Sequence, residues 1–184
     1  NMRLRHLGAS VVTYNAAINA CEKASRWHEA LGAFANMQRR RLQADVITCN
    51  AVMSAYGKSS RWHESLDMFA DMQLQCLEHS VITYIAAVGA CEKGFRWQEA
   101  LDMIYLMQAR RLKPHVSTRN AAISACGKRA RWQEAFGMFL DMQSRRLKPN
   151  GITHSAAISA CDQGARWHEA LGLVSSMRLR RLEL

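Results

Sequence analysis

One short phrase recurs along the chain at a constant interval of 35 residues. It reads RWHEAL at 26, RWHESL at 61, RWQEAL at 96, RWQEAF at 131 and RWHEAL at 166, and it contains all five tryptophans. A second phrase, VVTYNAAINACEK at Val11, returns at the same interval at Val46, Val81, Val116 and Gly151. Tandem copies of one short unit restrict the chain to a repeat architecture, in which each unit packs only against its neighbours.

This register divides the 184 residues into successive units without a linker or a low-complexity tract between them. We expect the tail of a preceding repeat in residues 1–10, and a nearly complete last repeat in 151–184. The full repeats between them are 11–45, 46–80, 81–115 and 116–150. The sequence therefore predicts one continuous array, and we interpret the chain as a piece of a longer one.

Each unit has the pattern of two short amphipathic helices. In the first unit the second helix carries an apolar stripe of helical period, made of Trp27, Ala30, Leu31, Phe34 and Met37. Two such helices cannot bury their apolar sides alone, whereas stacked copies can. The expected fold is an all-α solenoid, a right-handed superhelix of helix-turn-helix repeats. The tryptophans are expected to be largely buried in it as packing anchors.

The residue types that often form catalytic or metal sites fit structural roles here. One register place holds a cysteine in four units, and thiols so far apart cannot share a tetrahedral ion: Cys21, Cys91, Cys126 and Cys161. We expect them to be small buried residues. Another place exchanges histidine with glutamine and is expected on the surface: His28, His63, Gln98, Gln133 and His168. The sequence predicts no enzyme, metal, cofactor or small-molecule substrate.

The chain carries a formal net charge of +10, which favours an anionic partner. Arginines gather where the second helices are expected to end: Arg39-Arg40-Arg41, Arg110-Arg111, Arg145-Arg146 and Arg180-Arg181. Two interpretations stay open, namely solvated helix-end cations or an outer basic ridge that contacts ribosomal RNA, other structured RNA or an acidic protein. No apolar run approaches the roughly 18 residues that span a bilayer, so no membrane insertion is expected.

The phrases together, with tails such as RLKPN, resemble the pentatricopeptide-repeat family in its plain class of 35-residue units. The pair Tyr14-Asn15 and the prolines before the last residue of a unit, Pro114 and Pro149, carry the resemblance. It implies an array that binds single-stranded RNA, about one base per repeat. It also implies action in RNA stabilisation, processing or translation in a mitochondrion or plastid. Some relatives carry a catalytic domain, so one elsewhere in the parent protein stays open.

The resemblance also implies roles for individual residues. The fifth residue of a unit, helped by the last, would select a base: Asn15 with Asp45, Asn50 with Ser80, Asn120 with Asn150, Ser155 alone, and weakly Ile85 with His115. The second residue would pack between bases: Val12, Ile47, Ile82, Ser117 and Ile152. A late lysine would meet a phosphate: Lys23, Lys58, Lys93 and Lys128, with Gln163 breaking the series. Four residues that precede a first helix are also good N-caps: Ser10, Asp45, Ser80 and Asn150.

Two functions remain open at this point. The family's pairing of side chains with bases implies the order U, C, any base, a pyrimidine and a purine, from the 5′ end. Against such reading, Ile85 offers no hydrogen bond, Ser117 is a poor wedge, and His115 and Gln163 are irregular. These departures favour the alternative, a structural scaffold in a large organellar ribonucleoprotein or another assembly.

Overall fold

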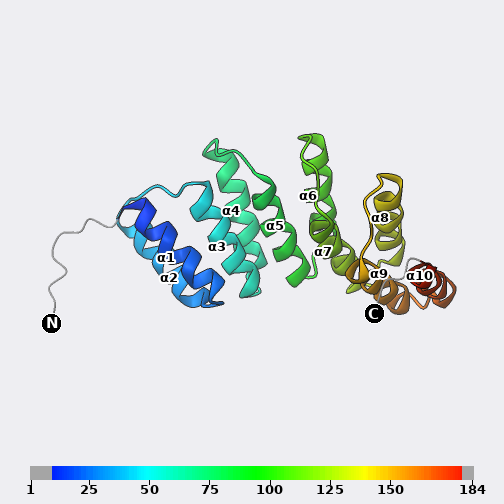
Figure 1. Ribbon diagram of the computed structural model, residues 1–184. Helices are drawn as coiled ribbons and strands as arrows, with labels where there is room; N and C mark the ends of the chain where they lie inside the picture. Colours follow the sequence, from blue (N-terminus) through cyan, green and yellow to red (C-terminus); the bar gives the residue numbers. More distant parts are fainter. Residues whose placement is uncertain (1–9, 180–184) are drawn as a thin grey trace. The chain divides into compact units, whose positions relative to one another are not determined.

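The computed structural model describes residues 10–179, and this range folds into ten α-helices and no strand (Figure 1). The first helices of the repeats are α1 (Val11–Lys23), α3 (Val46–Lys58), α5 (Val81–Lys93), α7 (Val116–Gly127) and α9 (Gly151–Gln163). The second helices are α2 (Trp27–Arg39), α4 (Trp62–Leu74), α6 (Trp97–Ala109), α8 (Trp132–Ser144) and α10 (Trp167–Leu179). The expected all-α solenoid class is confirmed. The tail expected in residues 1–9 lies outside the described residues.

The chain divides into two compact halves, residues 1–86 and 87–184, with the division inside α5. In the first half α1 packs against α2 and α3, and α3 packs against α4. In the second half α7 packs against α6, α8 and α9, and α9 packs against α8 and α10. A Cβ added to Gly127 would lie 3.2 Å from the Cβ of Ala160, so small residues let α7 and α9 approach closely. In each half, successive helical hairpins stack through their first helices.

Side chains of the preceding residue cap most of the first helices. Asp45 accepts a hydrogen bond from the Thr48 amide at 2.8 Å, and Asn150 accepts one from the Thr153 amide at 2.9 Å. Ser10 and Ser80 accept equivalent bonds at 3.4 and 3.3 Å. The expected N-caps are thereby confirmed, and each stabilises its helix by about 1 kcal/mol. His115, which was not expected to cap, makes no such bond.

The recurring arginine–tryptophan–glutamate phrase is explained by contacts within and between repeats. In every repeat the arginine precedes the second helix and pairs with the glutamate three residues later: Arg26–Glu29, Arg61–Glu64, Arg96–Glu99, Arg131–Glu134 and Arg166–Glu169. The Arg166 guanidinium also lies 4.4 Å from the ring centroid of Trp132 in the preceding repeat, and Arg131 lies likewise over Trp97. In the fourth and fifth repeats the arginine therefore links the glutamate of its own repeat to the tryptophan of the one before.

The prediction that all tryptophans are largely buried holds for four of them and is wrong for Trp167, which is 62% exposed. Stacking explains the difference, because the following repeat covers the ring where such contacts form: Gly164 and Arg166 lie on Trp132. Within the described residues no repeat follows Trp167. Four methionines of the second helices are buried more completely than the tryptophans: Met37, Met72, Met107 and Met142.

Truncating Trp132 should therefore destabilise the protein more than truncating Trp167. Trp132→Ala removes a ring packed against the next repeat, and we expect the free energy of unfolding to fall by about 2–3 kcal/mol. Trp167→Ala should cost less than about 1 kcal/mol, because this ring is already largely in water. Urea denaturation of the two variants and the parent chain measures the difference. Equal losses would contradict the assignment of the covered ring as an inter-repeat anchor.

Candidate nucleic-acid interface

Branched apolar side chains stand exposed at the second place of four repeats. Val12 is 75% exposed, Ile47 57%, Ile82 62% and Ile152 67%, each in the first turn of a first helix. Ser117 holds this place in the remaining repeat and is also exposed. Single exposed apolar residues are common on proteins. Their recurrence at one register place, however, indicates a surface that a partner covers.

A buried polar junction lies beside Val12 in the first repeat. Asn15 is only 8% exposed, and its Nδ2 donates to the two carboxylate oxygens of Asp45 at 3.0 and 2.8 Å. Its Oδ1 accepts a short hydrogen bond from the Thr48 hydroxyl. Asp45 ends the first repeat and Thr48 belongs to the second. The predicted pair Asn15–Asp45 therefore forms, and it is part of the contact between two repeats.

The fourth repeat reproduces this junction with an amide in place of the carboxylate. Asn120, 7% exposed, donates from Nδ2 to Asn150 Oδ1 at 3.3 Å and accepts from the Thr153 hydroxyl at 2.8 Å. The two junctions differ mainly in charge. Burial tends to raise the pKa of Asp45, but hydrogen bonds from Thr48 and Asn15 outweigh it and leave that pKa below its ordinary value. Asp45 is therefore an anion at neutral pH, whereas Asn150 is neutral.

The other predicted base-selecting residues do not form such junctions within the described residues. The Ser80 hydroxyl contacts Thr83, and the buried Oδ1 of Asn50 accepts no hydrogen bond there. Ile85 is 36% exposed, and Ser155 and His115 are exposed. The structure thus forms two of the predicted pairs as direct hydrogen-bonded contacts.

Sequence reasoning missed a recurrent threonine at the third place of every repeat. Its members are Thr13, Thr48, Thr83, Thr118 and Thr153. Thr48 and Thr153 are fully buried and donate to the fifth residue of the preceding repeat. The hydroxyl of Thr118, which follows the repeat that carries Ile85, is buried without a partner in the described part of the chain. The signal was available, because a polar residue that never varies among repeats indicates a fixed contact.

Two matched substitutions should separate these threonines. Thr153→Val removes the donor to Asn120, and a lost buried hydrogen bond of this kind should lower the free energy of unfolding by about 1–3 kcal/mol. Thr118→Val removes a buried hydroxyl that has no partner among the described residues, so the free energy of unfolding should be unchanged or should increase. Urea denaturation of both variants tests the assignment. A neutral Thr153→Val would show that the junction does not hold the repeats together.

The predicted phosphate-binding lysines fall into two kinds. Lys58 Nζ lies 2.6 Å from Oε1 of Glu22, which also accepts from Ser54 at 2.7 Å. Burial tends to raise the pKa of Glu22, but its bonds to Lys58 and Ser54 outweigh it, so this pKa lies below its ordinary value. The contacts Lys128–Glu92 at 3.2 Å and Ser124–Glu92 at 2.8 Å repeat the arrangement. Each of these lysines is held by a glutamate of the preceding repeat.

The other two lysines, Lys23 and Lys93, are exposed and form no ion pair with any described residue. The two kinds alternate because the place before the lysine alternates: it is Glu22, Gly57, Glu92 and Gly127 in turn. Sequence reasoning did not single out these two glutamates. The sequence predicted four equivalent cations. The structure instead has two lysines that form no ion pair with a described residue and two whose charge a glutamate already neutralises.

Burial makes several of the cysteine thiols less reactive, because it raises their pKa. Burial raises the pKa of Cys91 and Cys126 to about 12 and that of Cys49 to about 11, so these thiols stay uncharged at neutral pH. Within residues 10–179 no three histidine, cysteine or acidic side chains gather in a way that could hold a metal ion. The histidines expected on the surface, His28, His63 and His168, are exposed.

No described helix is both long and apolar enough to cross a membrane. The arginines expected at the helix ends are exposed where the structure describes them, and Arg180-Arg181 lie outside the described residues. One arginine that sequence reasoning missed is buried, namely Arg119 at 1% exposure. It holds the fourth place of its repeat, where the other repeats also carry buried residues: Tyr14, Cys49, Tyr84 and His154. The sequence could have revealed it, because arginine stands at a register place that carries aromatic residues, histidine or cysteine in the other repeats.

Comparisons with known proteins agree with this architecture. The model of the PPR repeat family matches residues 9–49 and 114–163, that of the PPR repeat matches 47–76, and that of the pentatricopeptide repeat domain matches 67–129. None of the curated proteins matches the sequence.

Among solved structures, the pentatricopeptide repeat protein PPR10 in complex with an 18-nt psaJ RNA element superimposes with a TM-score of 0.83 at 20% identity. The match covers 95% of this chain and 26% of that one. PPR10 from maize has a TM-score of 0.73 at 23% identity, covering 94% of this chain and 25% of that one.

A third match is the PPR domain of Arabidopsis thaliana protein-only RNase P 1 in complex with tRNA. Its TM-score is 0.79 at 13% identity, and the match covers 94% of this chain and 91% of that one. These likenesses show a shared fold. Together the family models extend without a gap from residue 9 to residue 163. The chain therefore belongs to the pentatricopeptide-repeat family.

Proposed function

We propose that the array binds single-stranded RNA along its first helices, about one base per repeat. The observation that carries the proposal is the recurrent exposed aliphatic side chain at the second place, beside the polar residue at the fifth. Covering such a side chain with the face of a base removes apolar surface from water and needs no particular base. The solved complexes of PPR10 with an RNA element and of the RNase P domain with tRNA support the same partner class.

The two junctions offer different edges to a base. At Asn15–Asp45 the amide nitrogen is already used, and the ionised carboxylate can only accept hydrogen bonds. A base that donates an N–H, as uracil does at N3, complements this edge, whereas cytosine places an acceptor there. At Asn120–Asn150 the closing residue is a neutral amide, which has both a donor and an acceptor. We therefore propose uracil for the first repeat and either pyrimidine for the fourth.

The chain itself supplies the variant that tests this reading. Asp45→Asn converts the first junction into the kind found at Asn150, which caps its helix equally well. The preference for U over C at the first base should fall by about 1 kcal/mol, the size of a net hydrogen bond. A competition assay on five-base RNA cores in a neutral flank measures it. Preference at the fourth base, opposite the unchanged Asn120, serves as the internal control.

The remaining proposed order is C for the second repeat, any base for the third and a purine for the fifth. Asn50→Ser should move the second base from C towards a purine and leave the others unchanged. If no base at any place matters in the parent chain or in either variant, the array reads no sequence. The scaffold function then replaces the proposed one.

The glutamates beside the lysines give a second test. Glu22→Gln with Glu92→Gln should free Lys58 and Lys128 for phosphates, so the affinity for single-stranded RNA should rise. That affinity should also decrease more steeply as the salt concentration increases. The slope of log K against log salt should steepen by up to about 1.4, from roughly 0.7 per single-strand contact.

Glu29→Gln with Glu64→Gln is the matched control for this test. It changes the net charge equally, but these carboxylates pair with arginines of the second helices. An equal effect of both double variants would show that only net charge matters, and it would remove the lysines from the proposed site.

The wider role rests on family membership. The chain spans about a quarter of the length of the PPR10 structures that it matches. We propose that the parent protein acts in RNA stabilisation, processing or translation in a mitochondrion or plastid, and that this array contributes binding and no catalysis. Imaging of the tagged full-length protein tests the compartment.

A further inference from the structure

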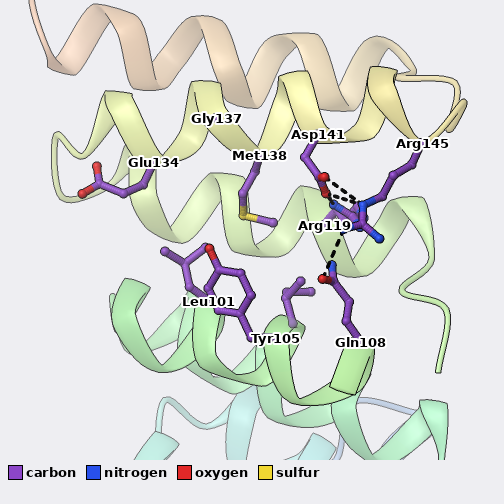
Figure 2. A pocket seen from close by; sticks show the side chains of 10 residues that line it. Leu101, Tyr105, Gln108, Arg119, Glu134, Gly137, Met138, Asp141 and Arg145 are labelled. Atoms are coloured by element: carbon purple, nitrogen blue, oxygen red, sulfur yellow. Dashed lines mark hydrogen bonds and ion pairs between the residues drawn. The ribbon is translucent and has the colours of Figure 1, made fainter. Parts of the chain in front are cut away.

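A groove runs between α6 and α8, formed by two adjoining cavities of about 290 and 400 Å³ (Figure 2). Leu101 and Tyr105 of α6 line the first cavity opposite Met138 of α8. The second cavity continues over the turn after α6 and is lined by Leu112, Pro114 and Leu147 together with basic residues. Both cavities share Gln108, Arg119 and Arg145. The groove therefore has apolar walls between α6 and α8, and basic residues line it where the two cavities meet and over the turn after α6.

A buried cation stands at this meeting point. Arg119 rises from α7 with 1% of its side chain exposed, and its Nη1 donates to Asp141 Oδ2 at 2.6 Å. Arg145 Nε lies 2.8 Å from Asp141 Oδ1, so one carboxylate is shared by two guanidinium groups. Burial tends to raise the pKa of Asp141, but the bonds from Arg145 and Arg119 keep it below its ordinary value. Arg119 Nε is buried without a partner in the described part of the chain.

The charges of the groove are unbalanced. Four basic residues line it, Arg111, Lys113, Arg119 and Arg145, against two acidic ones, Asp141 and Glu134. Glu134 lies at the opposite end of the first cavity from Asp141 and pairs with Arg131 (Figure 2). The end near Arg145 therefore carries an excess of positive charge beside a buried guanidinium nitrogen that has no acceptor among residues 10–179.

The same groove recurs two repeats earlier without these charges. A cavity of about 480 Å³ between α2 and α4 is lined at the same register places, with Gln43 for Lys113, Cys49 for Arg119 and Gln75 for Arg145. Its acidic residue, Asp71, corresponds to Asp141 and forms no ion pair among the described residues. The cations of the later groove are thus not needed to build the hairpin stack.

We propose that the groove between α6 and α8 binds a short segment of a partner protein in which an acidic side chain stands next to apolar ones. The carboxylate meets the exposed cations Arg145 and Lys113, which stand beside the buried guanidinium group of Arg119. The apolar side chains lie between Tyr105 and Met138. Tyr105 is 63% exposed, so this wall of the groove presents apolar surface to such a segment.

This partner class fits the groove better than a nucleic-acid backbone does. A phosphodiester chain would satisfy the cations but would leave the exposed ring of Tyr105 and the partly buried Leu101 uncovered. A peptide covers both, because grooves between helices commonly bind apolar anchors flanked by charges. The site lies on the second helices, and it does not depend on RNA binding by the first helices.

The test selects peptides on the intact chain from a phage-displayed library of random sequences of about 12 residues. The key variant is Lys113→Gln with Arg145→Gln, which installs the residues that the earlier groove already carries at these places. The control is Arg39→Gln with Arg40→Gln, which removes the same charge from exposed residues outside either groove. Tyr105→Ser probes the apolar wall separately.

We expect enriched peptides to combine aspartate or glutamate with leucine, isoleucine or phenylalanine. Their binding should weaken by about tenfold or more on the key variant, by severalfold on Tyr105→Ser, and hardly at all on the control. Equal weakening on the key variant and the control would overturn the proposal, since binding would then follow net charge. Failure to enrich any such peptide would also overturn it. So would selective loss of binding to an RNA duplex of about 16 base pairs on the key variant, which would assign the groove to phosphates.

Discussion

The structure depends on the contact by which each hairpin covers the open side of its neighbour. A unit of two helices leaves apolar surface that it cannot bury alone. Arg166 shows how the contact is made, because its guanidinium pairs with Glu169 and lies on the ring of Trp132. Where the described chain offers no following hairpin, Trp167 is left 62% exposed. Stability is therefore shared between neighbours, and a tryptophan is only as buried as the next repeat makes it.

The polar junctions of the first and fourth repeats couple this stacking to the proposed reading of RNA. Asn15 holds Asp45 of its own repeat and accepts from Thr48 of the next, so the edge offered to a base is fixed by the inter-repeat contact. Such an edge is preorganised, which reduces the entropy that binding must overcome. It also means that a substitution at these places changes stability and base preference together. Thr153 and Thr118 differ in this respect, since Thr153 completes a junction and the Thr118 hydroxyl has no partner in the described part of the chain.

The first and second helices serve different proposed partners for a physical reason. The first helices present isolated aliphatic side chains beside amides and lysines, a surface suited to flat bases and phosphates. The second helices border longer grooves, whose character is set by few side chains. Arg145 and Arg119 stand where the earlier groove has Gln75 and Cys49, and with them a groove lined by one acidic residue, Asp71, becomes a basic one. Repetition thus fixes the scaffold, and departures from it mark where individual repeats differ in function.

Periodicity by itself was enough to predict the helices, their order and their caps, because these depend on local patterns such as Asp45 before Thr48. It also located the exposed aliphatic places, since a residue such as Val12 opposes the apolar side of its helix. The sequence could not show which charges meet. Lys58 finds Glu22, and Arg119 reaches Asp141, across separations that no local pattern records. Only stacking brings these side chains together, and it decides which lysines remain free, which tryptophan is covered and which arginine is buried.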